Sequence, residues 1–212
     1  MAAGSPRRVS RFGPDPRAFF DAVYEGEAPW VIGGVQPAMA ALVERFPPEG
    51  PALDLGCASG DLALHLAREG LEVVGVDFVE RAIEQANTRR STLAADLARR
   101  LVFRVADASR PSALGRFGSV FDSGFLHLLD AEASDRFVED LAAAVVPGGR
   151  AYLHEFAVEF PVPNVPRAVT EAEVRERFAE GAGWRVLHVA PAEFENTVAA
   201  PTPALVACVE RT

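Results

Sequence analysis

The chain has 212 residues, of which 49% are hydrophobic and 24% charged, and its formal net charge is −9. This length suits one domain with a substantial core, and the composition is ordinary for a globular protein. The acidic balance argues against nucleic acid as a partner, because phosphates require a basic face. Cys57 and Cys208 lie far apart and fit neither a disulfide framework nor a metal-ligand spacing, so we expect no metal.

These global features also predict where the protein works. Two isolated cysteines favour a reducing compartment, and no apolar run approaches the length of a membrane span. Residues 1–15 carry three arginines but no apolar core, which is typical of a disordered tail rather than a secretory signal. We therefore expect a cytoplasmic protein with no membrane partner. Nothing in the sequence demands more than a monomer.

Residues 16–48 are expected to form a helical cap at the start of a single domain over 16–212. The segment 16–24 has apolar residues on one side of a helix, and a loop over 26–35 holds Trp30. A second helix over 36–46 ends at two consecutive prolines.

Beyond residue 50, short apolar runs alternate with helical patterns. The alternation predicts an α/β domain in which helices cover both faces of a mostly parallel, seven-stranded sheet. The last two strands lie close enough in sequence to pair antiparallel at the C-terminal end. The predicted strands are 52–55, 72–77, 101–105, 119–122, 150–158, 184–189 and 204–210, and the predicted helices are 60–69, 80–100, 133–145 and 170–179. A polar stretch leaves open whether the helix over 80–100 is continuous.

A glycine turn follows the first strand, in the sequence Leu-Asp-Leu-Gly-Cys-Ala-Ser-Gly-Asp over 53–61. Turns between a strand and a helix seat nucleotide-like ligands in α/β proteins. A dinucleotide fingerprint counted from Gly56 requires glycine at the position of Ala58. Asp54 ends the strand, where its carboxylate would repel a pyrophosphate but accept a bond from an ammonium group. The turn therefore favours a zwitterionic or cationic nucleoside over a nicotinamide dinucleotide.

Two further acids end the next strands. Asp77 lies where a carboxylate can take both ribose hydroxyls of an adenosine. Asp107 ends the third strand and is placed to accept the exocyclic amine of adenine. Three acid-ended strands around one glycine turn are a specific pattern, and together they predict an adenosine site.

These residues resemble the class I S-adenosylmethionine-dependent methyltransferases. Asp54, Gly56 and Gly60 match the first motif of that family, acid-x-Gly-x-Gly-x-Gly, with Ala58 in place of the middle glycine. The resemblance runs from about Phe19 onward, and it implies a Rossmann-like domain with S-adenosyl-L-methionine as cofactor. The cofactor contacts that it implies are Trp30, Asp54, Gly56, Cys57, Gly60, Asp77, Phe78, Asp107, Ala108 and Ser123.

The N-terminal segment resembles the small-molecule branch of that family, which includes thiopurine, thiol, halide and heterocyclic-toxin methyltransferases. The similarity lies in residues 19–24, in Pro29-Trp30 and in Gln36-Pro37. In that branch the Pro-Trp segment covers the cofactor, which is the favoured role for Trp30, and the alternative is a core aromatic. The implied activity is methyl transfer to sulfur, oxygen or nitrogen of a small aromatic or heterocyclic molecule. The alternatives are a non-catalytic S-adenosylmethionine-binding sensor and, more weakly, a nicotinamide dehydrogenase.

His127 is the candidate general base. It follows the loop after the fourth strand, where an acceptor is expected to lie, and an unperturbed imidazole pKa of ~6.5 suits proton transfer at neutral pH. The alternative is a buried histidine bonded to a backbone carbonyl. A thiolate or halide acceptor would need no base at all. Cys57 has no base beside it, so we do not expect it to act as a nucleophile.

Overall fold

The computed structural model describes residues 16–161 and 166–212, so the tail predicted over 1–15 lies outside the described residues. The described residues form a seven-stranded sheet in the order β3-β2-β1-β4-β5-β7-β6. Strands β1 to β5 pair parallel, and β7 runs antiparallel between β5 and β6. The strands are β1 Ala52–Leu55, β2 Val73–Asp77, β3 Leu101–Val105, β4 Phe117–Ser123, β5 Val145–Phe156, β6 Trp184–Phe194 and β7 Thr202–Arg211. The predicted fold is confirmed.

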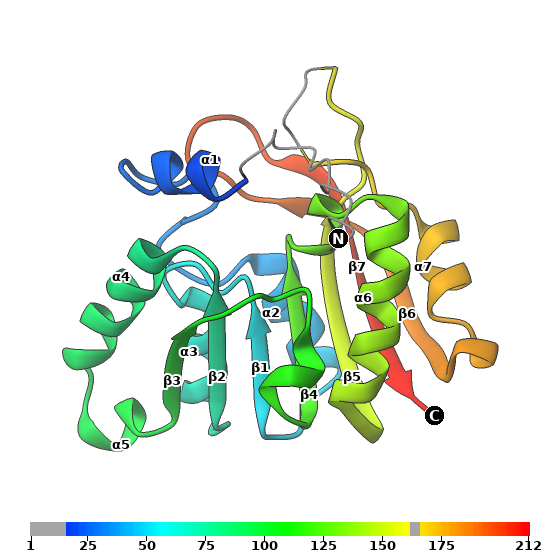
Figure 1. The fold of residues 1–212 in the computed structure, drawn as a ribbon, viewed down its shortest axis with the longest axis horizontal. Coiled ribbons are helices and arrows are strands. Elements are labelled where there is room, and N and C mark those ends of the chain that lie inside the picture. Colours follow the sequence, from blue (N-terminus) through cyan, green and yellow to red (C-terminus); the bar gives the residue numbers. More distant parts are fainter. Residues whose placement is uncertain (1–15, 162–165) are drawn as a thin grey trace, which may run out of the picture.

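Helices cover both faces of this sheet. Successive side chains of each strand point to opposite faces, so each face carries apolar side chains that the helices bury. Leu53 and Leu55 of β1 belong to the apolar cluster under α6 and α7, whereas Ala52 belongs to the cluster under α2 and α3. Helix α1 stands apart, above the carboxyl ends of the strands (Figure 1). The helices are α1 Pro16–Val23, α2 Pro37–Arg45, α3 Asp61–Arg68, α4 Glu80–Ser91, α5 Ala95–Ala98, α6 Ala131–Ala144 and α7 Glu171–Arg177.

Several element boundaries differ from the sequence prediction, and one question that it left open is decided. The helical pattern over 80–100 breaks into α4 and α5 at residues 92–94. Strand β5 begins at Val145, directly after α6, rather than at 150. The β6–β7 hairpin extends to the pair Phe194 and Thr202, beyond both predicted strands. Pro191 obscures that extension in the sequence, but β6 is an edge strand, where a missing N–H is tolerated.

Hydrogen bonds, two of them made by the side-chain amide of Gln36, join the hairpin to the N-terminal segment. Gln36 Nε2 donates to the Glu195 carbonyl at 3.0 Å, and Glu195 N–H donates to Gln36 Oε1 at 2.9 Å. Close by, Thr197 N–H donates to the Pro29 carbonyl at 2.9 Å. These bonds hold the Pro29-Trp30 segment against the β6–β7 turn, above the carboxyl ends of the central strands.

Candidate active site

The glycine turn between β1 and α3 adopts left-handed backbone conformations at three positions. Gly56 has φ 63° and Gly60 has φ 84°, which glycine adopts without a steric cost. Ala58 has φ 50°, and in the described residues it is the sole non-glycine with a positive φ. This conformation costs an L-residue roughly 1–2 kcal/mol. Backbone strain of this kind clusters at ligand-binding sites, which supports a functional role for the turn.

Asp77, at the end of β2, holds the strained residue in place. Its Oδ2 accepts the Ala58 N–H at 3.1 Å, and its Oδ1 accepts the Val79 N–H at 2.9 Å. Burial raises the pKa of Asp77, and the backbone donors oppose that shift. Each carboxylate oxygen keeps a further lone pair. Because Asp77 lines a cavity, those lone pairs are available to a pair of ligand hydroxyls.

Asp54 lies buried beneath the turn and faces a second, smaller cavity. Its Oδ2 accepts the Ala63 N–H from the first turn of α3 at 3.1 Å. Burial raises the pKa of Asp54 to about 8, with smaller contributions from the carboxyl groups around it. A cation placed against this group would favour the ionised form and lower that pKa. Asp54 is therefore suited to a positively charged ligand group.

Two adjoining cavities open beside these acids. The smaller, of about 60 Å³, is lined by the turn, by Asp54 and by the 30–39 segment. The larger, of about 270 Å³, has mostly aromatic walls. Both are lined by Trp30, Gly56, Ser123 and Phe194. The aromatic residues of the larger cavity are Phe19, Phe20, Tyr24, Trp30, Phe78, Phe125, Phe156 and Phe194.

Trp30 lies at the junction of the two cavities. Its Nε1 donates to the Tyr24 hydroxyl at 3.2 Å, and the two rings meet edge to face at 5.9 Å. The indole face is a favourable neighbour for a ligand cation such as a sulfonium. Trp30 is only half-buried, so it is a cavity wall as well as part of an aromatic cluster with Phe20 and Tyr24.

The structure brings eight of the ten predicted cofactor residues to these two cavities, whereas Gly60, at the start of α3, and Asp107 line neither. Phe78, Ala108 and Ser123 line the larger cavity, and Cys57 lines the smaller one. Burial raises the pKa of the Cys57 thiol well above its usual range, which keeps it protonated. Asp107 is exposed and lies outside both cavities, where its Oδ1 accepts the Ser109 N–H at 2.9 Å. Its contact with adenine stays a prediction.

His127 lines the larger cavity and is almost completely buried. Its Nδ1 accepts the Phe156 N–H at 3.2 Å, and its ring stacks on Phe156 with centroids 4.6 Å apart. Burial lowers the pKa of His127 to about 3. The imidazole is therefore neutral at physiological pH.

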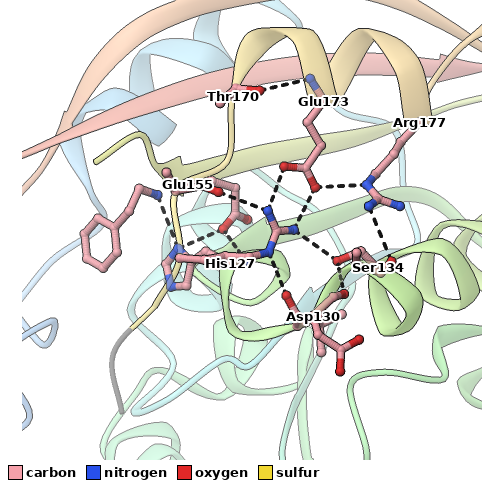
Figure 2. Close-up of polar contacts among 12 residues, drawn as sticks. His127, Asp130, Ser134, Glu155, Thr170, Glu173 and Arg177 are labelled. Carbon is pink, nitrogen blue, oxygen red and sulfur yellow. Dashed lines mark hydrogen bonds and ion pairs between the residues drawn. The ribbon is translucent and has the colours of Figure 1, made fainter. Parts of the chain in front are cut away.

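Glu155 is a residue that sequence reasoning missed. It is fully buried, its Oε2 lies 2.9 Å from His127 Nδ1, and the same oxygen accepts the backbone N–H of His127 at 3.1 Å (Figure 2). Because side chains alternate along a strand, His154 and Glu155 point to opposite faces of β5, and the partner of Glu155 is His127 rather than its neighbour. The sequence offered one signal for Glu155, namely an acidic residue within the apolar run that forms β5.

Comparison with known proteins identifies the family. A family profile described as a methyltransferase domain matches residues 52–149. The chain is 32% identical over 187 residues to a 2-heptyl-1-hydroxyquinolin-4(1H)-one methyltransferase of Mycobacteroides abscessus, covering 82% of this chain and 80% of that protein. The chain belongs to the class I S-adenosylmethionine-dependent methyltransferases. The small-molecule branch is the one it resembles.

Solved structures agree with this assignment. A structure from work on conversion of a disulfide bond into a thioacetal group during echinomycin biosynthesis has a TM-score of 0.78 and 28% identity, covering 92% of each chain. A Burkholderia thailandensis 1,6-didemethyltoxoflavin-N1-methyltransferase, solved with its acceptor and S-adenosylhomocysteine, has a TM-score of 0.70 at 21% identity, covering 93% of this chain and 87% of that one. At that identity the second match shows the shared fold.

This methyltransferase uses S-adenosyl-L-methionine and transfers its methyl group to a small molecule. The comparisons do not favour the alternative of a non-catalytic sensor. Within residues 16–161 and 166–212, no helix is both long and apolar enough to cross a membrane, and no cluster of His, Cys, Asp or Glu is arranged to hold a metal ion.

Proposed function

We propose that this methyltransferase methylates an oxygen atom on a planar, mostly apolar heterocycle. The observation that carries the proposal is the cavity of about 270 Å³, whose walls are aromatic side chains with His127 among them. Aromatic walls favour a flat ring by stacking and edge-to-face contact. The hydroxyquinolone named for the 32% identical relative combines such a ring with an N-hydroxyl oxygen.

The cofactor is proposed to span the two cavities. Asp77 would accept the ribose hydroxyls, Asp54 would face the ammonium group, and Trp30 would cover the sulfonium. Gly56, Gly60 and Cys57 would contact it through the backbone of the turn, with Phe78, Ala108 and Ser123 along the cavity wall. The fit rests on the buried carboxyl of Asp54 in the smaller cavity and the spare lone pairs of Asp77 in the larger one.

The chemistry needs little from the protein beyond alignment. S-adenosylmethionine supplies an activated methyl group, because a neutral thioether is the leaving group. The aromatic walls exclude water and hold the acceptor ring, and the turn holds the cofactor. Proximity and orientation of this kind contribute most of the catalysis in such a displacement.

We also propose that residues 16–48 act as a cap over the site and that the protein is a cytoplasmic monomer without a nucleic-acid partner. Support for the cap comes from Phe19, Phe20 and Trp30 in the cavity wall. Support for the rest comes from the net charge of −9 and the buried free cysteines. Sedimentation analysis and size-exclusion chromatography test the oligomeric state directly.

Two measurements test the proposed function. Calorimetric titration with S-adenosylmethionine and S-adenosylhomocysteine is expected to show binding, with no heat from the NADH control. Product analysis by mass spectrometry then compares an N-hydroxyquinolone with the same quinolone lacking the hydroxyl and with an aromatic thiol. Methylation of the N-hydroxyl compound alone supports the proposal, whereas turnover of the thiol in its place assigns a sulfur acceptor.

A further inference from the structure

The hydrogen bonds around His127 define which of its ring nitrogens carries the proton. The Phe156 N–H points at Nδ1 from 3.2 Å, and that bond requires a lone pair on Nδ1. A neutral imidazole with a lone pair on Nδ1 has its proton on Nε2. If the proton were on Nδ1, the Phe156 N–H would face another N–H and lose its partner, at the cost of an unsatisfied buried donor.

Glu155 supports the same tautomer. Its Oε2 lies 2.9 Å from Nδ1, a hydrogen-bond distance that requires one proton between the two atoms. Because the Phe156 bond requires a lone pair on Nδ1, that proton belongs on the carboxyl group, and the Phe156 N–H and the Glu155 O–H share the single Nδ1 lone pair. Burial raises the pKa of Glu155 to about 7, and the pKa of the neighbouring buried Asp122 is also raised. Two adjacent buried carboxyl groups do not ionise together, so the pair retains a proton at neutral pH. Asp122 has the larger shift and takes that proton first, and Glu155, with its pKa of about 7, carries a second proton in part of the molecules at neutral pH.

A small set of titratable and charged groups surrounds the pair, and Glu155 Oε1 has no hydrogen-bond partner among the described residues. The titratable and charged groups that act on the imidazole and its partner are Asp122 on β4, Glu155 and His154 on β5, and Arg167 ahead of α7. Arg167 is committed elsewhere, because its guanidinium makes two bonds of 2.7 Å to the Glu173 carboxylate. Figure 2 shows Glu173 on the far side of this network from His127.

The other ring nitrogen is available to a ligand. No bond joins His127 Nε2 to any described residue, although the side chain is nine-tenths buried and lines the larger cavity. We propose that His127 presents an Nε2–H donor to an anionic acceptor oxygen, that Glu155 is the positioning residue which maintains this tautomer, and that the site selects acceptors already deprotonated on binding. This inference rests on the proposed function, because it concerns the acceptor of that same site.

The reaction balances without a general base. The acceptor loses its proton to solvent before it binds, and the anionic oxygen then attacks the methyl carbon. The carbon–oxygen bond forms as the carbon–sulfur bond breaks, and its electron pair stays on sulfur. The negative charge on oxygen disappears during this step, so a donor bond to that oxygen is stronger in the bound substrate than in the transition state. His127 therefore contributes to acceptor binding and selectivity more than to the rate of the chemical step.

The kinetics of three variants distinguish a hydrogen-bond donor from a general base at His127. The Gln side chain in His127→Gln keeps an N–H donor but has no basic nitrogen, whereas His127→Phe has neither. For a donor, we expect His127→Phe to raise KM for an N-hydroxyquinolone about tenfold or more with kcat within about threefold, and His127→Gln to raise KM about threefold. His65→Gln, on α3 and outside both cavities, is the control and leaves both parameters unchanged. A loss of kcat of about a hundredfold or more in both His127 variants would instead assign a general base and overturn the inference.

A measurement that needs no acceptor separates this inference from the proposed function. Two-bond nitrogen–proton NMR correlations of the intact protein identify the protonated nitrogen of His127. We expect the Nε2–H tautomer in the wild type and in Glu155→Gln, whose amide can donate to Nδ1, and a changed tautomer balance in Glu155→Ala. An Nδ1–H tautomer in the wild type refutes the inference whatever the acceptor is. Absence of N-hydroxyquinolone turnover with an Nε2–H tautomer refutes only the proposed function.

Discussion

The substitution Gly60→Ala tests how tightly the glycine turn is built. Gly60 has φ 84°, so any L-residue there is strained by roughly 1–2 kcal/mol. A Cβ would also lie 2.7 and 2.9 Å from two carbons of the Phe103 ring. The same edge of that ring also lies 2.7 and 2.8 Å from the position a Cβ would take on Gly75, so Phe103 fills the space over both glycines. Crowding in a packed region adds roughly 1–3 kcal/mol.

Gly60→Ala is therefore expected to lower the free energy of unfolding by about 3 kcal/mol. For a domain of this size the midpoint of thermal unfolding then falls by about 6–12 °C. Scanning calorimetry measures the midpoint, and urea titration measures the free energy. Because Gly60 precedes the first turn of α3, we also expect weaker S-adenosylmethionine binding in the calorimetric titration.

Gly70→Ala is the matched control. Gly70 has φ 99° but open space where a Cβ would lie, so its substitution introduces backbone strain without crowding. We expect a loss of roughly 1–2 kcal/mol and unchanged cofactor affinity. Equal destabilisation of the two variants would show that the contact with Phe103 contributes nothing. A Gly60→Ala protein of wild-type stability would refute the reasoning about the turn altogether.

Substitutions at three further residues test the proposed cofactor contacts. Asp77→Ala is expected to weaken S-adenosylmethionine binding by about ten- to a hundredfold, and calorimetric affinity equal to the wild type would contradict the ribose assignment. Asp54 has a pKa of about 8 in the folded protein and an ordinary value of 3.8, so its contribution to stability is complete below 3.8 and is lost as pH rises through about 8. Asp54→Asn is expected to flatten the dependence of the free energy of unfolding on pH in this range, as measured by urea titration. An unaltered pH dependence would argue against the raised pKa of Asp54. Trp30→Ala is expected to weaken cofactor binding about tenfold and Trp30→Phe less, whereas equal losses would remove the case for an aromatic–sulfonium contact.

The fold and the placement of the glycine turn beside Asp54 and Asp77 were predictable because both follow local rules. An apolar run that ends in an acid places Asp54 and Asp77 at the carboxyl edge of a parallel sheet wherever the strands pair. The glycine spacing marks the turn, and the substitution at Ala58 identifies the position that the structure shows to be strained. These features depend on a few neighbouring residues each.

The acceptor side depends on register, which no local pattern encodes. Phe194 reaches the cavities only because the β6–β7 hairpin pairs as far as Thr202. Glu155 meets His127 only because β5 lies beside β4 with His154 opposite Ser123. Alternation along β5 correctly separates His154 from Glu155, but it cannot name a partner on another element. The aromatic cavity and the Glu155 contact were therefore invisible until the strands were aligned.

The hydrogen bonds between the Gln36 side chain and the Glu195 backbone affect the order in which the enzyme is assembled. They join residues 159 positions apart, and Thr197 bonds to Pro29 across a similar distance. A growing chain can complete the glycine turn and its acids once β4 has emerged, but the wall over them requires the β6–β7 hairpin. Contacts between such distant segments form late, because the long loop must close first. The nascent protein therefore acquires its nucleoside-binding turn well before it can shelter a methyl donor from water.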